Sequence, residues 1–497
     1  MANLRNDQKT TVADESKILS IELILRARDH WEANEILLIE KAIKFAIVKH
    51  EGQKRFDGTP YVNHVIYTGK NLAHLGMDTT TIVAGILHDT IEDTQTTEEE
   101  VAKEFGSDVA FLVMGVSKLS KLRYQGIERH VESLRKFFVA SASDIRVVII
   151  KLADRLHNAY TLEHVRPEKR ERIAKETLEL HARLADRLGM GQLKAELEDL
   201  AFPFAYPDDY KKVKGLVEES TKNSKKNTDE VLRNIKDSLE LENVNVIRID
   251  SRVKHLYSLF LKLKKYDFDI TKIHDIIALR VIVPDIASCY KTLGVIHAEY
   301  RPLPGRMKDY IAVPKLNGYK SLHTTILTRD GNTAEIQIRT LEMHEEAEFG
   351  IASHLHYKEI GKNKSQQEIE RKTSWTKDLL ELQKQIEDKD EYLHTLKTDF
   401  FQTRVFVFTP KGDVIDLPEG STSIDFAYAV HSKIGDKMRE AKVNGKLVSF
   451  DTILKRGDVI EIVTAKNAKP SEKWLENVKT NMARRHILKY LQDSPVP

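Results

Sequence analysis

His88-Asp89-Thr90-Ile91-Glu92-Asp93 is the most informative stretch of the sequence. His88 lies four residues before Glu92, so on a helix the two side chains project to the same side. Asp89 and Asp93 repeat this spacing one residue further on. An imidazole with several carboxylates can bind a divalent cation such as Mn²⁺ and leaves a carboxylate to handle a proton. The stretch therefore predicts a metal site in a helical region.

Two other segments add polar side chains at core-like helix positions. One presents Asp154, Asn158 and Thr161 on a single face by the same spacing. Such a polar stripe on an otherwise apolar helix normally requires a ligand. The other segment contributes a cation, Arg55, and a further histidine, His64.

The alternative is a structural role for these residues. A His-Asp dipeptide alone is a surface pair or a helix cap in roughly nine cases out of ten. Three separated segments with this polarity reverse those odds, and together they favour a catalytic metal site.

Length and composition limit the class of protein. A chain of 497 residues suggests about three domains. The net charge of +2 means that any attraction for phosphate must be local. One cysteine, Cys289, excludes an internal disulfide framework and cysteine-based zinc sites. The N-terminal residues lack the apolar core of a signal peptide, and no apolar run is long enough to span a bilayer, so we expect a cytosolic protein without membrane contact.

The predicted secondary structure changes along the chain. Helical periodicity prevails up to about residue 200, and β-branched strands such as 279–283 and 335–339 appear after about residue 244. The expected organisation is an all-α domain at 1–200, a helical connector at 201–245, a mixed α and β domain at 246–360, an amphipathic helical linker at 361–402, a small β-rich domain at 403–466 and the start of a helical domain at 467–497.

A second group of candidate residues lies in the mixed domain. We expect Arg252, Lys254 and Ser258 to open a helix, with Lys254 and Ser258 on one face. Asp275 precedes the apolar strand 279–283, where a junction between loop and strand can present it to a metal.

The segment 300–323 concentrates positive charge around a single acid, Asp309, with tyrosines interleaved. Its members are Arg301, Arg306, Lys308, Lys315 and Lys320, and the tyrosines Tyr300, Tyr310 and Tyr319. Concentrated positive charge beside aromatic faces suits a polyphosphate that carries a stacking base.

The strand 333–339 alternates between polar and apolar residues. Glu335, Gln337 and Arg339 share one face. An isolated strand of this kind presents a solvated sheet face roughly four times in five. The basic segment beside it weakens that interpretation and favours a binding face.

The segments around His64, His88 and Asp154 resemble the HD hydrolase domain of the RelA/SpoT homologue family, in its bifunctional Rel/SpoT form. The resemblance implies Mn²⁺ held by His64, His88, Asp89 and Asp154. It also implies that Glu92 and Asp93 support attack by an activated water on a 3′-diphosphate, and that Arg55, Asn158 and Thr161 line the nucleotide pocket. The synthetase-only branch of the family has lost the His-Asp…Glu-Asp set that stands here.

Five further motifs resemble the synthetase domain of the same family. They are Arg252-Val-Lys254, His274-Asp275-Ile-Ile-Ala-Leu-Arg280, Gly305-Arg-Met-Lys-Asp-Tyr310, Gly318-Tyr-Lys-Ser-Leu-His323 and Glu335-Ile-Gln-Ile-Arg339. The resemblance implies a nucleotidyltransferase-like α+β fold with a mixed sheet. It also implies transfer of the β,γ-pyrophosphate of ATP to the 3′-hydroxyl of GDP or GTP.

The resemblance further assigns roles to individual residues of this domain. Asp275 and Glu335 would hold Mg²⁺, and one of them would help to deprotonate the 3′-hydroxyl. The remaining nucleotide contacts would be Arg252 and Lys254 with ATP, Lys308 and His323 near phosphates, Tyr319 stacked on guanine, and Ser258, Arg306, Lys315, Gln337 and Arg339 in the same pocket.

Residues 404–464 resemble the TGS domain, a small β-grasp fold. His431 matches a histidine that contacts deacylated tRNA in ribosome-bound relatives, although a role as a helix cap fits it equally well. Longer family members continue with further regulatory domains, and we expect this chain to lack that C-terminal end.

Three functions remain open from the sequence. The first is a bifunctional enzyme that makes and hydrolyses (p)ppGpp in the stringent response. The second is an HD phosphohydrolase for other nucleotides, with a silent synthetase. The third is a regulator docked on tRNA or the ribosome.

Overall fold

The computed structural model describes residues 32–120, 143–273, 277–315, 317–329, 331–353, 395 and 404–493. Described residues up to 353 form one unit, and those from 395 onward form a second. Asp275 and, apart from Thr395, the predicted linker helix lie outside the described residues. Within the described ranges, no helix is long and apolar enough to cross a membrane.

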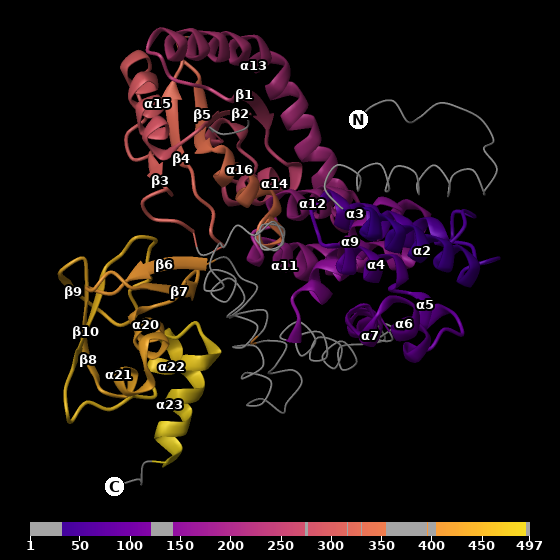
Figure 1. The fold of residues 1–497 in the computed structure, drawn as a ribbon. Coiled ribbons are helices and arrows are strands. Elements are labelled where there is room, and N and C mark those ends of the chain that lie inside the picture. Colours follow the sequence, from indigo (N-terminus) through magenta and orange to yellow (C-terminus); the bar gives the residue numbers. More distant parts are fainter. Residues whose placement is uncertain are drawn as a thin grey trace. The chain divides into compact units, whose positions relative to one another are not determined.

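The first unit begins with a layer of helices (Figure 1). They are α2 (Ala33–Lys49), α3 (Val62–His74), α4 (Thr79–Leu87), α5 (Thr90–Asp93), α6 (Glu98–Phe105), α7 (Ser107–Ser120), α9 (Arg146–Tyr160), the short 3₁₀ helix η1 (Leu162–His164), α10 (Pro167–Glu176), the π-helical turn η2 (Thr177–His181), α11 (Ala182–Arg187) and α12 (Gly191–Ala205). The all-α fold predicted for this region is confirmed.

Helix α4 lies at the centre of this layer and positions the predicted metal site. Asp78 caps its first turn by accepting a hydrogen bond from the backbone N–H of Thr81 at 2.7 Å. Nearly every residue of α4 is buried, as expected for a helix that is apolar on all sides. Helices α3 and α9 pack against it and against each other, so the three helices that carry the predicted ligands adjoin.

The predicted helix through His88-Asp89 is interrupted. Helix α4 ends at Leu87 and α5 begins at Thr90, and His88 and Asp89 form the turn between them. Both residues keep right-handed helical dihedrals. The predicted helical region is thus present as two successive helices, α4 and α5, with His88 and Asp89 between them.

The connector is a single long helix, α13 (Pro207–Leu241). Its first residue is a proline, which fits the first helical position because no intrahelical partner for that N–H exists. The preceding helix, α12, continues through Pro203 and ends at Ala205, so only Tyr206 separates it from α13.

A five-stranded mixed sheet follows, in the order β1-β2-β5-β4-β3. Its strands are β1 (Arg248–Val253), β2 (Ile277–Val283), β3 (Lys308–Asp309), β4 (Leu322–Leu327) and β5 (Thr333–Thr340). The β2–β5 pair is parallel and the other pairs are antiparallel. The predicted mixed sheet is confirmed.

One face of this sheet forms a core with α13 and α15 (Ile286–Glu299), as Figure 1 shows. Ile336 and Ile338 of β5 point into that core and are fully buried. The alternation of the strand therefore turns Glu335, Gln337 and Arg339 to the opposite face.

Two further helices, α14 (Leu256–Lys265) and α16 (Leu341–Phe349), complete this part. The prediction that Arg252 and Lys254 open a helix was wrong. Arg252 lies in β1 and pairs with Ala278 of β2, and Lys254 lies in the turn before α14. Ser258 is in the helix, as expected.

The second unit is small and contains short antiparallel sheets, β10-β8-β9 and β6-β7. Its elements are β6 (Arg404–Phe408), β7 (Val414–Pro418), α20 (Ser423–Val430), α21 (Ser432–Asp436), β8 (Met438–Val443), β9 (Lys446–Val448), β10 (Ile460–Thr464), α22 (Trp474–Asn477) and α23 (Asn481–Asp493). The buried carboxylate of Asp425 accepts hydrogen bonds from the backbone N–H groups of Thr422, Lys479 and Thr480, and so ties the last helix to this unit.

Candidate functional site

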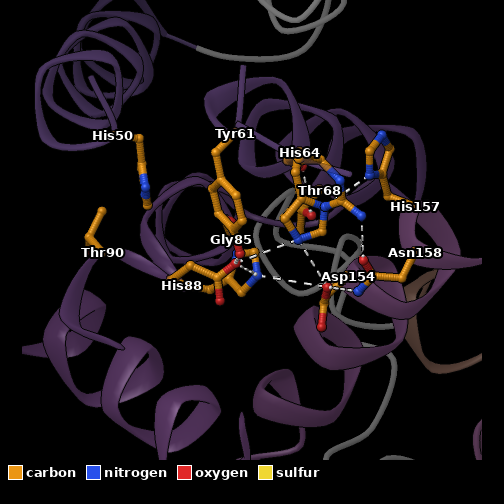
Figure 2. A network of polar contacts seen from close by, with 12 residues as sticks. His50, Tyr61, His64, Thr68, Gly85, His88, Thr90, Asp154, His157 and Asn158 are labelled. Atoms are coloured by element: carbon orange, nitrogen blue, oxygen red, sulfur yellow. Dashed lines mark hydrogen bonds and ion pairs between the residues drawn. The ribbon is translucent and has the colours of Figure 1, made fainter. Parts of the chain in front are cut away.

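Two imidazoles and two carboxylates meet where α3, α4 and α9 come together (Figure 2). His64 Nε2 lies 3.1 Å from Asp154 Oδ1 and 3.5 Å from Asp89 Oδ2. His88 Nε2 lies 3.1 Å from Asp89 Oδ2. All four residues are buried, and donor atoms of His64, His88 and Asp154 lie within 4.8 Å of one another. The structure thus brings together the four predicted metal ligands.

The environment of His88 identifies the nitrogen that is available to a metal. Its Nδ1 lies 2.8 Å from the carbonyl oxygen of Gly85, which can only accept, so Nδ1 carries the hydrogen. Its Nε2 is buried and makes no hydrogen bond within the described part of the chain. This nitrogen lies 3.1 Å from Asp89 Oδ2 and 3.8 Å from Asp154 Oδ1, so it is the atom of His88 that a divalent cation would bind.

Neighbouring side chains hold the two carboxylates in place. The hydroxyl of Tyr61 donates to Asp89 Oδ2 at 2.7 Å. Lys151 Nζ donates to Asp154 Oδ2 at 2.7 Å, and Asn158 Nδ2 donates to Asp154 Oδ1 at 2.6 Å. The orientation of each carboxylate is therefore set by groups outside the cluster.

The electrostatics of the cluster favour ionised carboxylates. Burial acts to raise the pKa of Asp89, but His88 and His64 hold it well below its usual value. Burial also opposes the charge of Asp154, whose pKa is kept low mainly by Lys151. Burial acts to lower the pKa of His88, yet the charge of Asp89 raises it to about 9. A divalent cation can take the place of that proton on His88.

Glu92 and Asp93 lie in α5, directly after this cluster. Glu92 is half-buried and Asp93 is exposed. Gln53 donates from Nε2 to the backbone oxygen of Asp93 at 2.8 Å and so joins the loop before α3 to α5. The two carboxylates are placed beside the cluster and are not part of it.

Arg55, Asn158 and Thr161 come together beside the four predicted metal ligands, as predicted. Arg55 Nη2 donates to Asn158 Oδ1 at 2.9 Å and to Thr161 Oγ1 at 3.0 Å. Since Asn158 also bonds Asp154, the guanidinium is linked to the metal cluster through one side chain.

Sequence reasoning missed three residues of this site: Tyr61, Lys151 and His157. Lys151 and His157 lie three residues before and after Asp154 on α9, so helical spacing was a usable signal for both. Nothing in the sequence pattern connects Tyr61 to Asp89, because that contact depends on how the helices pack.

A cavity of about 270 Å³ opens on the polar face of the sheet. Its wall contains most of the residues predicted to bind nucleotide in the synthetase-like part. They are Arg252, Lys254, Ser258, Lys315, Tyr319, His323, Glu335, Gln337 and Arg339. Arg306 and Lys308 are exposed and do not line this cavity, although Lys308 pairs with His323 across the β3–β4 ladder.

His323 stands at the centre of the polar contacts in the cavity. Its Nδ1 lies 3.3 Å from Glu335 Oε1, and its Nε2 lies 2.8 Å from the hydroxyl of Tyr319. Gln337 donates to the other carboxylate oxygen of Glu335 at 3.3 Å. The ammonium of Lys315 lies 4.6 Å from the centre of the Tyr319 ring. An acid, an aromatic face and cations thus share one wall.

Two buried arginines add positive charge to this region. Glu348 Oε1 lies 3.2 Å from Arg339 Nη2 and 3.5 Å from Arg280 Nη1. One carboxylate thus faces two guanidiniums, and in the described structure neither Nε has a hydrogen-bond partner. Burial and the charge of Arg339 lower the pKa of Arg280. A polyphosphate would balance the remaining positive charge.

The cavity also has a wall from the N-terminal helical layer. Asp186, Lys194 and Glu198 of α11 and α12 line it. Close backbone approach makes this possible, because a Cβ at Gly191 would collide with the carbonyl oxygen of Ala347. This contribution was not predicted, and no spacing in the sequence indicates it.

In the second unit, His431 has a structural role. Its side chain accepts a hydrogen bond from the backbone N–H of Lys433 at 3.0 Å and caps α21. The expected alternative role, a helix cap, is confirmed. The proposed tRNA contact stays a prediction.

Three family models match the chain in succession: the HD domain at residues 42–191, the region found in RelA/SpoT proteins at residues 251–362, and the TGS domain at residues 405–464. A guanosine-3′,5′-bis(diphosphate) 3′-pyrophosphohydrolase of Aquifex aeolicus is 46% identical over 458 residues, which are 91% of this chain and 64% of that protein. A GTP pyrophosphokinase of Myxococcus xanthus is 44% identical over 459 residues, 92% of this chain and 60% of that protein.

The bifunctional (p)ppGpp synthase/hydrolase SpoT of Escherichia coli K12 is 42% identical over 461 residues, 93% of this chain and 65% of that protein. The chain therefore spans less than two thirds of the length of these relatives. With all three domain matches, and with identities of 42 to 46% over at least 91% of its length, the chain belongs to the RelA/SpoT family.

Proposed function

We propose that this chain both synthesises and hydrolyses (p)ppGpp. The observation that carries the proposal is the presence of two separate acidic centres in one unit. His64, His88, Asp89 and Asp154 form the first, and Glu335 lies in the cavity of the second. The names of the relatives include both activities, which supports assigning one activity to each centre.

For hydrolysis, the first centre would hold Mn²⁺. Bound there, a divalent cation supplies a water of lowered pKa and charge neutralisation of the leaving pyrophosphate. Glu92 or Asp93, placed directly after the cluster, would take the proton from the attacking water. Arg55, held by Asn158 and Thr161, would bind nucleotide phosphate. The bond that breaks joins the 3′-oxygen of the ribose to phosphorus, giving GDP or GTP and pyrophosphate.

For synthesis, the cavity would bind ATP and GDP or GTP. The ring of Tyr319 would stack on guanine, while Arg252, Lys254 and the buried Arg339 would bind phosphates. Glu335, with Asp275 from outside the described residues, would hold Mg²⁺ and accept the proton of the 3′-hydroxyl. The 3′-oxygen then bonds to the β-phosphorus of ATP, and AMP leaves.

A role for the TGS domain in contacting deacylated tRNA or the ribosome would add regulation. His431 uses one ring nitrogen to cap α21, and we propose that the other ring nitrogen makes the contact.

One experiment separates the three functions left open by the sequence. The protein is incubated with labelled ATP, GDP and Mg²⁺, and Mn²⁺ is added afterwards. Formation of ppGpp followed by its conversion to GDP supports the proposal. Hydrolysis of added ppGpp without synthesis would indicate a phosphohydrolase with a silent synthetase. Neither activity, together with binding of deacylated tRNA, would indicate a regulator.

A further inference from the structure

Two buried imidazoles face each other at the edge of the metal cluster. The Nδ1 atoms of His64 and His157 lie 2.9 Å apart, and the residues are 1% and 7% exposed (Figure 2). His64 comes from α3 and His157 from α9. Such a contact is a hydrogen bond only when one Nδ1 carries a hydrogen and the other does not.

The rest of the cluster determines which nitrogen donates. His64 Nε2 points at Asp154 Oδ1 and Asp89 Oδ2, so it is the atom that a metal would bind. A neutral imidazole that binds metal through Nε2 carries its hydrogen on Nδ1. His64 then donates from Nδ1, and His157 Nδ1 accepts.

His88 provides an internal comparison. Its Nδ1 donates to the carbonyl oxygen of Gly85, and its Nε2 faces the same carboxylates. Each histidine of the cluster thus has an acceptor behind it, a backbone carbonyl in one case and a second imidazole in the other. The acceptor behind His64 is a side chain, so it can be changed by mutation.

We propose that His157 is a positioning residue of the metal centre, which accepts the Nδ1 hydrogen of His64 and so turns the bare Nε2 of His64 toward the metal. The inference rests on the proposed metal site of the hydrolase part. His157 is not itself a ligand, because its Nδ1 contacts Nδ1 of His64 and not the Nε2 atom that faces Asp89 and Asp154.

The ring of His157 is held in the required orientation. Tyr67 stacks on it with ring centres 4.7 Å apart and an interplanar angle of 25°. His157 also follows Asp154 by three residues on α9. One helix therefore supplies both a ligand and the group that orients a ligand on α3, and this fixes the relative position of the two helices at the metal.

Two substitutions in the full chain test this role. His157→Leu removes the acceptor, and His157→Asn keeps an oxygen near the position of Nδ1. Mn²⁺ affinity is measured by isothermal titration calorimetry without nucleotide, and thermal unfolding of each variant confirms that it folds. We expect the leucine variant to bind Mn²⁺ roughly 10- to 100-fold more weakly, and the asparagine variant to stay within about 3-fold of the parent chain.

Each outcome decides the matter. Recovery of affinity in the asparagine variant supports the inference, because a role in packing alone would not distinguish the two substitutions by their acceptor. Unchanged affinity in the leucine variant, or equal loss in two folded variants, would overturn it, as would a parent chain that binds no Mn²⁺. A parent chain that binds Mn²⁺ but does not hydrolyse ppGpp would remove the proposed function and leave this inference standing.

Discussion

Arg55 donates a hydrogen bond to Asn158 at 2.9 Å across 103 residues of sequence. Asn158 in turn donates to Asp154 at 2.6 Å. The loop before α3 and helix α9 thus form one polar network, in which the group proposed to hold phosphate is attached to a group proposed to hold the metal. The first two predictions change the two ends of this network separately.

Arg55→Lys should weaken substrate binding without affecting the metal. Both bonds to Asn158 and Thr161 come from Nη2, so the guanidinium has further N–H donors for phosphate, whereas lysine would have to make all of these contacts from a single nitrogen. We expect the KM for ppGpp hydrolysis to rise about tenfold, equivalent to about 1.4 kcal/mol, while Mn²⁺ affinity is unchanged. Steady-state kinetics and Mn²⁺ titration check the two parts, and a large loss of Mn²⁺ affinity would contradict the prediction.

Asp154→Asn should abolish hydrolysis and leave synthesis intact. The change removes a buried charge that faces His64 and His88 and replaces the carboxylate that lies 2.7 Å from Lys151 Nζ with a neutral amide. We expect hydrolysis to fall at least roughly 100-fold, as measured by release of pyrophosphate from ppGpp. Asp144→Asn is the matched control, because Asp144 lies just before the same helix and pairs with Arg146 at 2.7 Å.

Glu335→Gln should have the opposite effect. The amide preserves size but removes the charge proposed to hold Mg²⁺ and to accept the 3′-hydroxyl proton, so synthesis should fall at least roughly 100-fold. Hydrolysis in the same preparation is the control. Loss of both activities in a folded variant would show that the two centres are not separate.

Gly191→Ala should impair synthesis specifically. A Cβ at this position meets the carbonyl oxygen of Ala347, and both residues line the cavity, so the wall must shift. We expect synthesis to fall by up to about 100-fold and hydrolysis to be retained. Gly294→Ala on α15 is the control, because nothing lies within 4 Å of the added methyl group. It should leave synthesis unchanged and stabilise the helix by about 0.5–1 kcal/mol.

His181→Gln should make the free energy of unfolding less dependent on pH. Burial, with a smaller contribution from Arg155, lowers the pKa of His181 to about 3. In the unfolded chain His181 has a pKa near 6.5 and binds a proton below that pH, whereas in the folded chain it stays neutral down to about pH 3. The free energy of unfolding therefore decreases as the pH falls from about 6.5 toward 3. The parent chain should lose about 2 kcal/mol more than the variant between about pH 7 and pH 5. Urea denaturation at the two pH values measures this difference, and equal losses would contradict the prediction.

Patterns within one element were predictable from the sequence. The helical face of Asp154, Asn158 and Thr161 and the alternation of β5 each depend only on local periodicity, and both occur in the structure. The ligand set could also be proposed, because His and Asp at core-like positions have few structural explanations.

Features that depend on packing between distant segments were not predictable. No local pattern shows that α4 ends at Leu87 and α5 begins at Thr90. Arg252 lies in β1 because that segment pairs with β2. The contact of Tyr61 with Asp89 joins different elements, and no periodicity encodes it. The position of Asp275, outside the described residues, stays a prediction.

Part of the cavity wall is formed by Asp186, Lys194 and Glu198. This contribution affects where the chain can be truncated. The RelA/SpoT match begins only at residue 251, well after these side chains. A fragment that begins at residue 251 would lack these side chains, so the cavity would be open to solvent on that side. It would also lack Gly191, whose backbone lies close to the carbonyl oxygen of Ala347. The smallest piece expected to retain the intact cavity therefore starts before α11, inside the segment that matches the HD domain.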